Sequence, residues 1–236
     1  MWLDGMAGTD GGMANTVSKH WKQDPETVRA DILAAARREF AENGLSGARI
    51  QRIVDGTRTS KRMIFYYFGD KDGLYRAVLE DAYRKVRRQE AALDLDGLTP
   101  EEALARLVAF TFDHHAANPD FIRLVAIENI HGARHLSDLP GLAETNRGAI
   151  AVLERIHAAG VAAGRFRDDV RPLDLHWHIS ALCFFNVANR ATFSASFGDG
   201  AFSADAQARL KAQAVNSVLD VVCHPSDRGR GPDRGE

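Results

Sequence analysis

The spacing of apolar residues predicts a chain built almost entirely of α-helices. Apolar side chains recur every three or four positions, as Val28, Ile32, Ala36 and Phe40 do, and this spacing places them on one face of a helix. No segment alternates apolar and polar residues for the length of a strand. We therefore expect an all-α fold, with helices at about 24–42, between Ser46 and Val54, at 60–67, from Asp70 through Val86, and at 100–117, 119–132, 141–164, 172–195 and 203–223.

Residues that typically begin helices stand at the predicted boundaries. Asp24, Ser46, either Thr59 or Ser60, and Asp70 precede the first four helices, and a short polar side chain at that place accepts a hydrogen bond from the first turn. Proline is favoured at the first helical position because it has no N–H to lose there. The later starts carry Thr99-Pro100, Asn118-Pro119, Pro140-Gly141, Arg171-Pro172 and Ser203.

Three short helices followed by a long one indicate two domains. Two short helices joined by a turn of about three or four residues form a helix-turn-helix motif. We expect the second of these helices to hold Ile64, Phe65 and Phe68 in the core of a three-helix module. The predicted parts are a flexible tail at 1–20, a helix-turn-helix domain at 21–70, a larger helical bundle domain at 71–224, and a flexible tail at 225–236.

Charge is balanced overall but uneven along the chain. Lys and Arg number 30 against 32 Asp and Glu, so the formal net charge is −2. Residues 19–90 hold 16 Lys/Arg against 11 Asp/Glu, whereas the remainder holds 14 against 21. A basic front and an acidic back are expected where one part of a protein touches a polyanion and the other does not.

Cysteine usage and hydropathy indicate a cytoplasmic protein. Cys183 and Cys223 lie far apart without a CxxC spacing, which argues against a disulfide framework or a cysteine-rich zinc site. No apolar run approaches the length of about 18–20 residues that spans a bilayer. The first 20 residues lack the basic and apolar regions of a secretory signal.

The segment GLSGARIQRIVDGTRTSKRMIFYYFGDKDGLYRAVL resembles the DNA-binding segment of the TetR family of bacterial transcriptional regulators. Residues 24–80 carry the resemblance, which implies a dimeric, ligand-responsive repressor without a cofactor. The shared features are the apolar pair Ile50 and Ile53, the helix start Thr59-Ser60, the run Ile64-Phe65-Tyr66-Tyr67-Phe68, and Lys71 followed by Leu74.

Three positions depart from the family pattern. The family commonly has glycine in the turn, where this chain has Arg58, and again early in the second helix, where it has Arg62. Phe65 replaces a common tyrosine, so a phosphate hydrogen bond from that hydroxyl is lost. The two added cations indicate altered operator specificity rather than loss of DNA binding.

The resemblance assigns residues to the DNA surface. In a helix-turn-helix the second helix enters the major groove with its N-terminal residues at the base edges, which places Thr59, Lys61 and Arg62 there. Arginine and lysine favour guanine O6 and N7, whereas Tyr66 and Tyr67 would contact phosphate or sugar. With the flanking cations and helix starts that would hold phosphates, the candidates are Ser46, Arg49, Arg58, Thr59, Ser60, Lys61, Arg62, Tyr66, Tyr67 and Lys71.

The resemblance also implies a homodimer on a palindromic DNA operator and an unknown small-molecule effector. The dimer would form through the last two long helices, 172–195 and 203–223, of which the first is apolar nearly all round. The alternative is that these helices only pack their own core. Candidates to line the effector cavity, which could equally be plain core, are Phe110, Phe112, His114, Phe121, Leu124, Ile127, Glu128, His131, Trp177 and Phe184.

A metal protein or an enzyme is the rival interpretation. Glu128 and His131 have the i, i+3 spacing of helical carboxylate metal sites, with His135 one turn further on. His114, His115, His176 and His178 are further candidate ligands. A di-metal bundle needs a second such pair and two further glutamates, which are not found. The histidines leave open a mononuclear zinc site or a fortuitous surface cluster. No nucleophile elbow or phosphate-binding glycine loop is present. We expect a regulator that has neither catalytic nor metal-binding residues.

Overall fold

The computed structural model describes residues 24–137, 139 and 141–224, and the predicted tails at 1–20 and 225–236 lie outside this range. Apart from one isolated bridge between Phe166 and Cys223, the described residues form helices and their connections, which confirms the all-α prediction. The elements are α1 Pro25–Gly47, α2 Ile50–Asp55, α3 Lys61–Phe68, α4 Lys71–Ala91, α5 Pro100–Ala117, α6 Pro119–Ile130, α7 Arg134–Ser137, α8 Leu142–Ala162, α9 Pro172–Ala188, α10 Arg190–Phe197, η1 Asp199–Phe202 and α11 Ala204–Val222.

The first helix breaks at Gly44, close to its predicted end. Asp24 caps it by accepting a hydrogen bond from the Thr27 N–H at 3.3 Å. Gly44 has a non-helical backbone, with a φ of 64°, and one further turn follows this kink. Ser46 therefore lies in the last turn of α1, and the prediction that it caps α2 is wrong. Arg49 is the N-cap of α2, and its N–H donates to the buried carboxylate of Glu39 at 2.9 Å.

The junction of α3 and α4 is fixed by caps and by a close backbone approach. Ser60 accepts a hydrogen bond from the Met63 N–H at 3.4 Å, and Asp70 accepts one from the Gly73 N–H at 2.6 Å. A Cβ at Gly73 would lie 2.1 Å from the carbonyl oxygen of Phe68, so only glycine fits there. The direction of α3 relative to α4 follows from these contacts.

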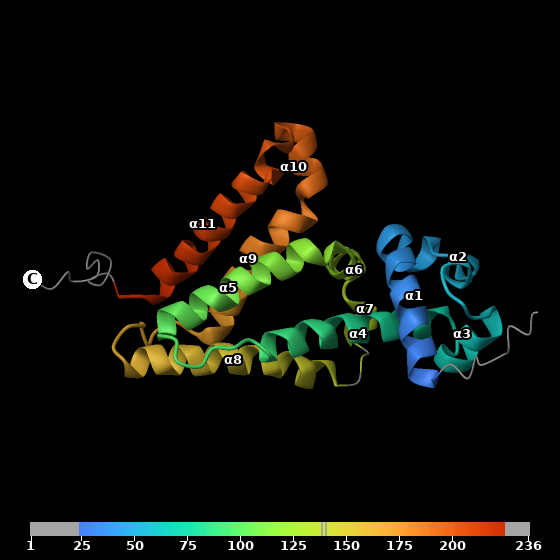
Figure 1. Ribbon diagram of the computed structural model, residues 1–236, viewed down its shortest axis with the longest axis horizontal. Helices are drawn as coiled ribbons and strands as arrows, with labels where there is room; N and C mark the ends of the chain where they lie inside the picture. Colours follow the sequence, from blue (N-terminus) through green and yellow to red (C-terminus); the bar gives the residue numbers. More distant parts are fainter. Residues whose placement is uncertain (1–23, 138, 140, 225–236) are drawn as a thin grey trace, which may run out of the picture.

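One apolar core joins the N-terminal module to the larger domain. It holds Ile32, Phe40, Ile64 and Leu74 of the module together with Leu124 of α6. Figure 1 shows α4 running from the module into the larger domain, with α6 and α7 beside the junction. The module is therefore packed against α4 and α6 and is not joined to the larger domain by a linker alone.

The larger domain is built around α5, α8, α9 and α11. Thr99 and Glu102 form a reciprocal capping box at the start of α5. The core of the larger domain includes Leu104 and Val108 of α5, and residues of α8, α9 and α11 pack around them. No helix in the described part of the chain is both long and apolar enough to cross a membrane.

The predicted helix 172–195 is wrong, because α9 ends at Ala188 and α10 begins at Arg190. Asn189 forms the break, and its carbonyl accepts hydrogen bonds from the Phe193 N–H and the Thr192 hydroxyl. The aromatic residues after the break pack on one another, with Phe193 and Phe197 ring centroids 4.8 Å apart. Their spacing continues that of α9, so the apolar pattern alone does not reveal the break.

Candidate nucleic-acid interface and ligand cavity

Helix α3 presents its N-terminal cations to solvent. Ile64 is fully buried and holds the helix to the module, whereas Lys61 and Arg62 are exposed. Tyr66 is 77% exposed on the same helix. The basic N-terminal end of α3 is therefore exposed to solvent.

Phe65 is more exposed, and Tyr67 more buried, than the sequence predicts. Phe65 is 37% exposed, so its assignment to the core is wrong, and the Lys61 ammonium lies 5.8 Å from its ring centroid. Tyr67 is half-buried against the module core and packs edge-on to Tyr66. Phe65 is adjacent to Ile64, about 100° around the helix, and that rotation carries it off the buried side.

The flanking candidates lie at the ends of neighbouring helices. Arg49, Thr59 and Ser60 come directly before α2 and α3, and Lys71 is the first residue of α4. The Lys71 ammonium donates to the carbonyl of Ser46 at 3.3 Å. This contact brings the start of α4 beside the end of α1, next to α2.

The turn before α3 does not need the glycine that Arg58 replaces. Among the described residues, Ala133 alone is a non-glycine residue with a left-handed φ, so Arg58 carries no such strain. Its N–H donates to the Asp31 carboxylate of α1 at 3.4 Å. The turn is therefore tied to α1 with ordinary backbone geometry.

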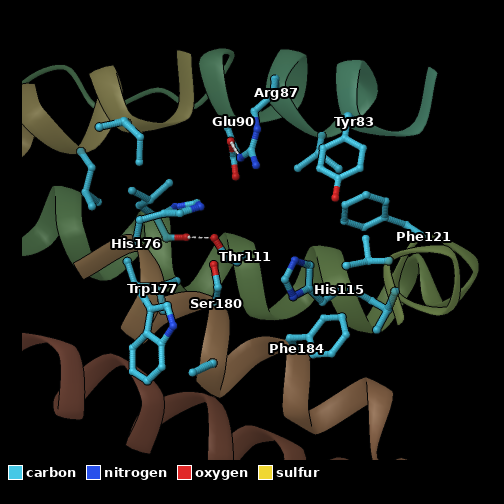
Figure 2. A pocket seen from close by; sticks show the side chains of 18 of the residues that line it. Tyr83, Arg87, Glu90, Thr111, His115, Phe121, His176, Trp177, Ser180 and Phe184 are labelled. Atoms are coloured by element: carbon cyan, nitrogen blue, oxygen red, sulfur yellow. Dashed lines mark hydrogen bonds and ion pairs between the residues drawn. The ribbon is translucent and has the colours of Figure 1, made fainter. Parts of the chain in front are cut away.

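A cavity of about 520 Å³ opens in the larger domain between α4, α5, α6, α8 and α9. In Figure 2, Arg87 and Glu90 extend from α4 on one side, with Thr111 and Ser180 opposite. Most of the wall is apolar or aromatic, which is typical of small-molecule sites. The lining residues are Tyr83, Val86, Arg87, Glu90, Leu107, Thr111, His115, Phe121, Ile122, Val125, Asn129, Ile150, Val152, Leu153, Leu173, His176, Trp177, Ile179, Ser180, Ala181 and Phe184.

The cavity gathers three of the predicted ligand-binding residues, Phe121, Trp177 and Phe184. The other candidates lie elsewhere: Leu124 is in the core shared with the N-terminal module, Phe112 lines a different hollow, His114 packs against Phe110 beside α4, and His131 is exposed at the end of α6. Neither Ile127 nor Glu128 faces the cavity.

Glu128 instead bonds three neighbours at the domain junction. Its carboxylate, 2% exposed, accepts hydrogen bonds from the Tyr75 hydroxyl at 3.0 Å and from the N–H groups of His135 and Leu136 at 3.2 Å. His135 Nδ1 lies 3.0 Å from it. Burial alone would raise the pKa of Glu128, but the bonds from His135, Tyr75 and Leu136 outweigh it and lower the pKa. A polar residue among apolar neighbours thus has protein partners and needs no ligand.

The cavity contains polar residues that the sequence analysis did not assign to it, among them two histidines named there only as candidate metal ligands. Arg87 and Glu90 form an ion pair within α4, and Glu90 is buried. Glu90 continues the buried stripe of Val78, Ala82 and Val86 at spacing four, a signal that could have placed it inside. The other polar lining residues are Tyr83, Thr111, His115, Asn129, His176 and Ser180.

The histidines of the cavity are neutral. Burial, then the nearby His114, lowers the pKa of His115 to about 4. Burial and the charge of Arg87 lower the pKa of His176. Burial raises the pKa of Tyr83. The Arg87–Glu90 pair therefore carries the charge of the described cavity wall at neutral pH.

The candidate metal ligands do not come together. Glu128 and His135 bond each other, whereas His131 is exposed on the C-cap of α6. Across the described ranges no group of three or more His, Cys, Asp or Glu side chains is arranged to hold a metal ion.

Two described protein families match this chain. Residues 32–78 match the family described as "Bacterial regulatory proteins, tetR family". Residues 100–218 match "Tetracyclin repressor-like, C-terminal domain".

Among solved structures, the putative transcriptional regulator SCO4942 of Streptomyces coelicolor is 28% identical with a TM-score of 0.61, over 83% of this chain and 98% of that one. The transcriptional regulator FadR of Bacillus subtilis, solved with stearoyl-CoA, has a TM-score of 0.63 at 15% identity, over 81% of this chain and 98% of that one, and shares the fold.

The HTH-type transcriptional repressor NicS of Pseudomonas putida is 39% identical over 172 residues, 73% of this chain and 81% of that protein. The HTH-type transcriptional repressor SCO4008 of Streptomyces coelicolor is 37% identical over 108 residues, 46% of this chain and 53% of that protein. These relatives are named as repressors rather than enzymes. The chain belongs to the TetR family of bacterial regulatory proteins.

Proposed function

We propose that this protein is a homodimeric repressor that binds a palindromic DNA operator and is released from it by a small molecule. The observation that carries the proposal is the helix α3, which is anchored by the buried Ile64 and exposes Lys61 and Arg62 at its N-terminal end. Because Ile64 already fixes α3 to the module, the helix can enter a major groove without a change in the fold of the module.

In this proposal, residues at the start of α3 contact the base edges. Arg62 is the first candidate for guanine O6 and N7 and Lys61 the second, with Thr59 beside them; a good bidentate contact discriminates by about 1–3 kcal/mol. Tyr66 is exposed and reaches phosphate or a thymine methyl, whereas the half-buried Tyr67 mainly supports it.

In this proposal, residues on either side of α3 contact the phosphates. Arg49, Arg58 and Lys71 supply cations, and the helix start at Ser60 supplies N–H groups. Ser46 contributes through its carbonyl, which positions the Lys71 ammonium. These contacts fix the register of the module on DNA but carry no sequence information.

Helix α9 supports dimerisation. Leu173, Trp177, Ala181 and Phe185 recur at spacing four and are all exposed, Trp177 by 74%. A stripe of large apolar residues in water marks an interaction surface. With α11 beside it, this stripe fits a four-helix interface with a second copy, and Leu173, Trp177 and Ala181 would then place the partner at the mouth of the cavity.

Helix α6 can couple the cavity to the DNA module. Phe121, Ile122 and Val125 line the cavity on this helix. Glu128, at its other end, holds Tyr75 of α4, the helix that continues directly from the module. A ligand that shifts α6 would move α4 and the two DNA-reading helices, provided that it binds one arrangement better than the other.

Selection of bound fragments from random duplex DNA tests the proposal. We expect a palindromic site, bound less tightly as salt rises. Arg62→Ala should lose about tenfold or more for the selected site while non-specific affinity changes little. Lys71→Ala should weaken all duplexes alike and reduce the salt slope by about one.

The control for these variants is Arg88→Ala, an exposed cation of α4 beyond the module. It should leave both affinities unchanged. An Arg62 variant that loses specific and non-specific affinity equally would refute its role in base readout. Absence of any salt-sensitive association would refute the DNA-binding proposal.

A further inference from the structure

The cavity wall holds buried polar atoms that lack a partner. Nε of Arg87 and Nδ1 of His115 have no hydrogen-bond partner within the described structure, and His115 is 8% exposed. Both residues line the cavity. An unpaired buried polar atom costs about 1–3 kcal/mol. Two of them in one cavity wall indicate a ligand that bonds to them.

Arg87 retains unused donor capacity. Its Nη1 donates to the carboxylate of Glu90, whereas a guanidinium has five N–H donors. The edge that carries Nε is therefore available for a second acceptor. A carboxylate matches that edge because its two oxygens accept two parallel N–H bonds.

The other polar residues of the wall disfavour a cation. His115 and His176 stay neutral because they are buried, and the positive charge of Arg87 acts on both. A cationic ligand would meet the same burial and the same repulsion. Glu90, the acidic side chain of the wall, is already paired with Arg87.

The remaining wall suits an apolar body. Tyr83, Phe121 and Phe184 extend into the cavity from α4, α6 and α9 (Figure 2). Val86, Leu107 and Ile122 add aliphatic surface. The wall therefore accepts either an aromatic ring or an aliphatic chain.

We propose that the cavity binds an amphipathic monocarboxylate, with its carboxylate on the Nε edge of Arg87, a polar atom within reach of His115, and its apolar body between Tyr83, Phe121 and Phe184. This inference rests on the proposed function, in which the effector enters this cavity. It names the chemistry that the effector must carry.

Titration calorimetry on the full chain without DNA tests the inference. The probes are benzoate and octanoate, each compared with its uncharged amide, together with the cation benzamidine. Because a hydrogen bond to a charged group is stronger than one between neutral groups, we expect at least one carboxylate to bind about tenfold more tightly than its amide. The two carboxylates together show whether the body is aromatic or aliphatic.

The variant pair Arg87→Gln with Glu90→Gln removes both charges, so no buried charge is left unpaired. We expect it to lose the preference for carboxylate over amide. The control is Arg84→Gln with Glu80→Gln, an exposed ion pair on the same helix, which should keep the preference. Arg87→Lys keeps the charge without the planar edge and should give an intermediate preference.

Equal binding of carboxylate and amide by the unaltered protein overturns the inference, as does tighter binding of benzamidine or no binding of any probe. Survival of the preference in the Arg87→Gln, Glu90→Gln variant also overturns it. Operator release is measured separately: carboxylates that bind without releasing DNA would refute the effector role and leave the inference standing. Release of DNA by amides and carboxylates alike would support a small-molecule effector but refute its identification as a carboxylate.

Discussion

Glu128 joins three helices through a buried carboxylate, so its loss should lower stability. Glu128→Gln keeps the shape but turns an amide NH₂ toward N–H and O–H donors, and we expect the free energy of unfolding to fall by about 2 kcal/mol or more. Tyr75→Phe removes one donor and leaves the backbone bonds in place. It should cost about 1 kcal/mol. Urea unfolding of both variants measures the difference, and equal losses would contradict this account.

The buried His115 should make the protein less stable in mild acid. Its pKa lies at about 4 in the folded state against an ordinary value of 6.5, so below pH 6.5 the unfolded chain binds a proton that the folded chain refuses. Stability is therefore lost as the pH falls from about 6.5 toward 4, by an amount on the order of 3 kcal/mol. Urea unfolding between pH 7 and pH 5 measures the slope.

His115→Leu should flatten that slope because the titrating group is gone. His131→Leu is the matched control, since His131 is exposed at the end of α6, and it should leave the slope unchanged. A slope that is the same in all three proteins would show that other groups cause the acid sensitivity.

The residue scale also shows where the sequence could be interpreted and where it could not. Glu128 was a candidate to line the effector cavity, whereas its carboxylate has a partner within the protein. The partner, Tyr75, stands 53 positions earlier, a distance that no local pattern spans. Phe65 was assigned to the core from its type, although its neighbour Ile64 already fills that position.

At the scale of elements, the link between α6 and α7 is strained at Ala133. Its φ is 56°, a left-handed conformation that costs an alanine about 1 kcal/mol or more. Ala133→Gly should therefore raise the free energy of unfolding by about 0.5–1 kcal/mol after the entropy that glycine loses. The control Ala30→Gly, at an exposed site inside α1, should lower it by about 1 kcal/mol. Two changes of the same sign would contradict the strain at Ala133.

Most elements could be predicted from capping residues together with apolar spacing. Asp24, Ser60, Asp70, Thr99 and Ser203 all cap helices as predicted. The errors fall where no capping side chain marks a boundary. At the break between α9 and α10, Asn189 has no side-chain cap bond, and the apolar spacing runs on through the aromatic residues of α10.

At the scale of the whole molecule, the direction of α3 follows from local residues, whereas the cavity does not. Caps at Ser60 and Asp70 and the close approach at Gly73 orient α3 within one short segment. The cavity needs five helices in their final places, and its polar residues come from α4, α5, α6 and α9. Its lining therefore appears only once the helices are packed.

If two copies pair through the apolar stripe of α9, a charge placed on that stripe should separate them. Phe185 is 53% exposed on the apolar stripe, so Phe185→Glu should leave the fold intact and place a charge where the second copy would pack, at a large cost in a buried interface. We expect a monomer by analytical ultracentrifugation. The operator affinity should fall steeply, because a single module reads only one half-site.

Ile130→Glu is the control for this variant, since Ile130 is 79% exposed and is the last residue of α6, outside α9 and α11. Both variants gain one negative charge, so they differ only in where that charge lies. The Ile130→Glu protein should stay dimeric and bind the operator normally. A Phe185→Glu protein that remains dimeric would place the interface elsewhere. A monomer that still binds the full palindrome at unaltered affinity would show that the two-fold symmetry of the site is not read by a preformed dimer.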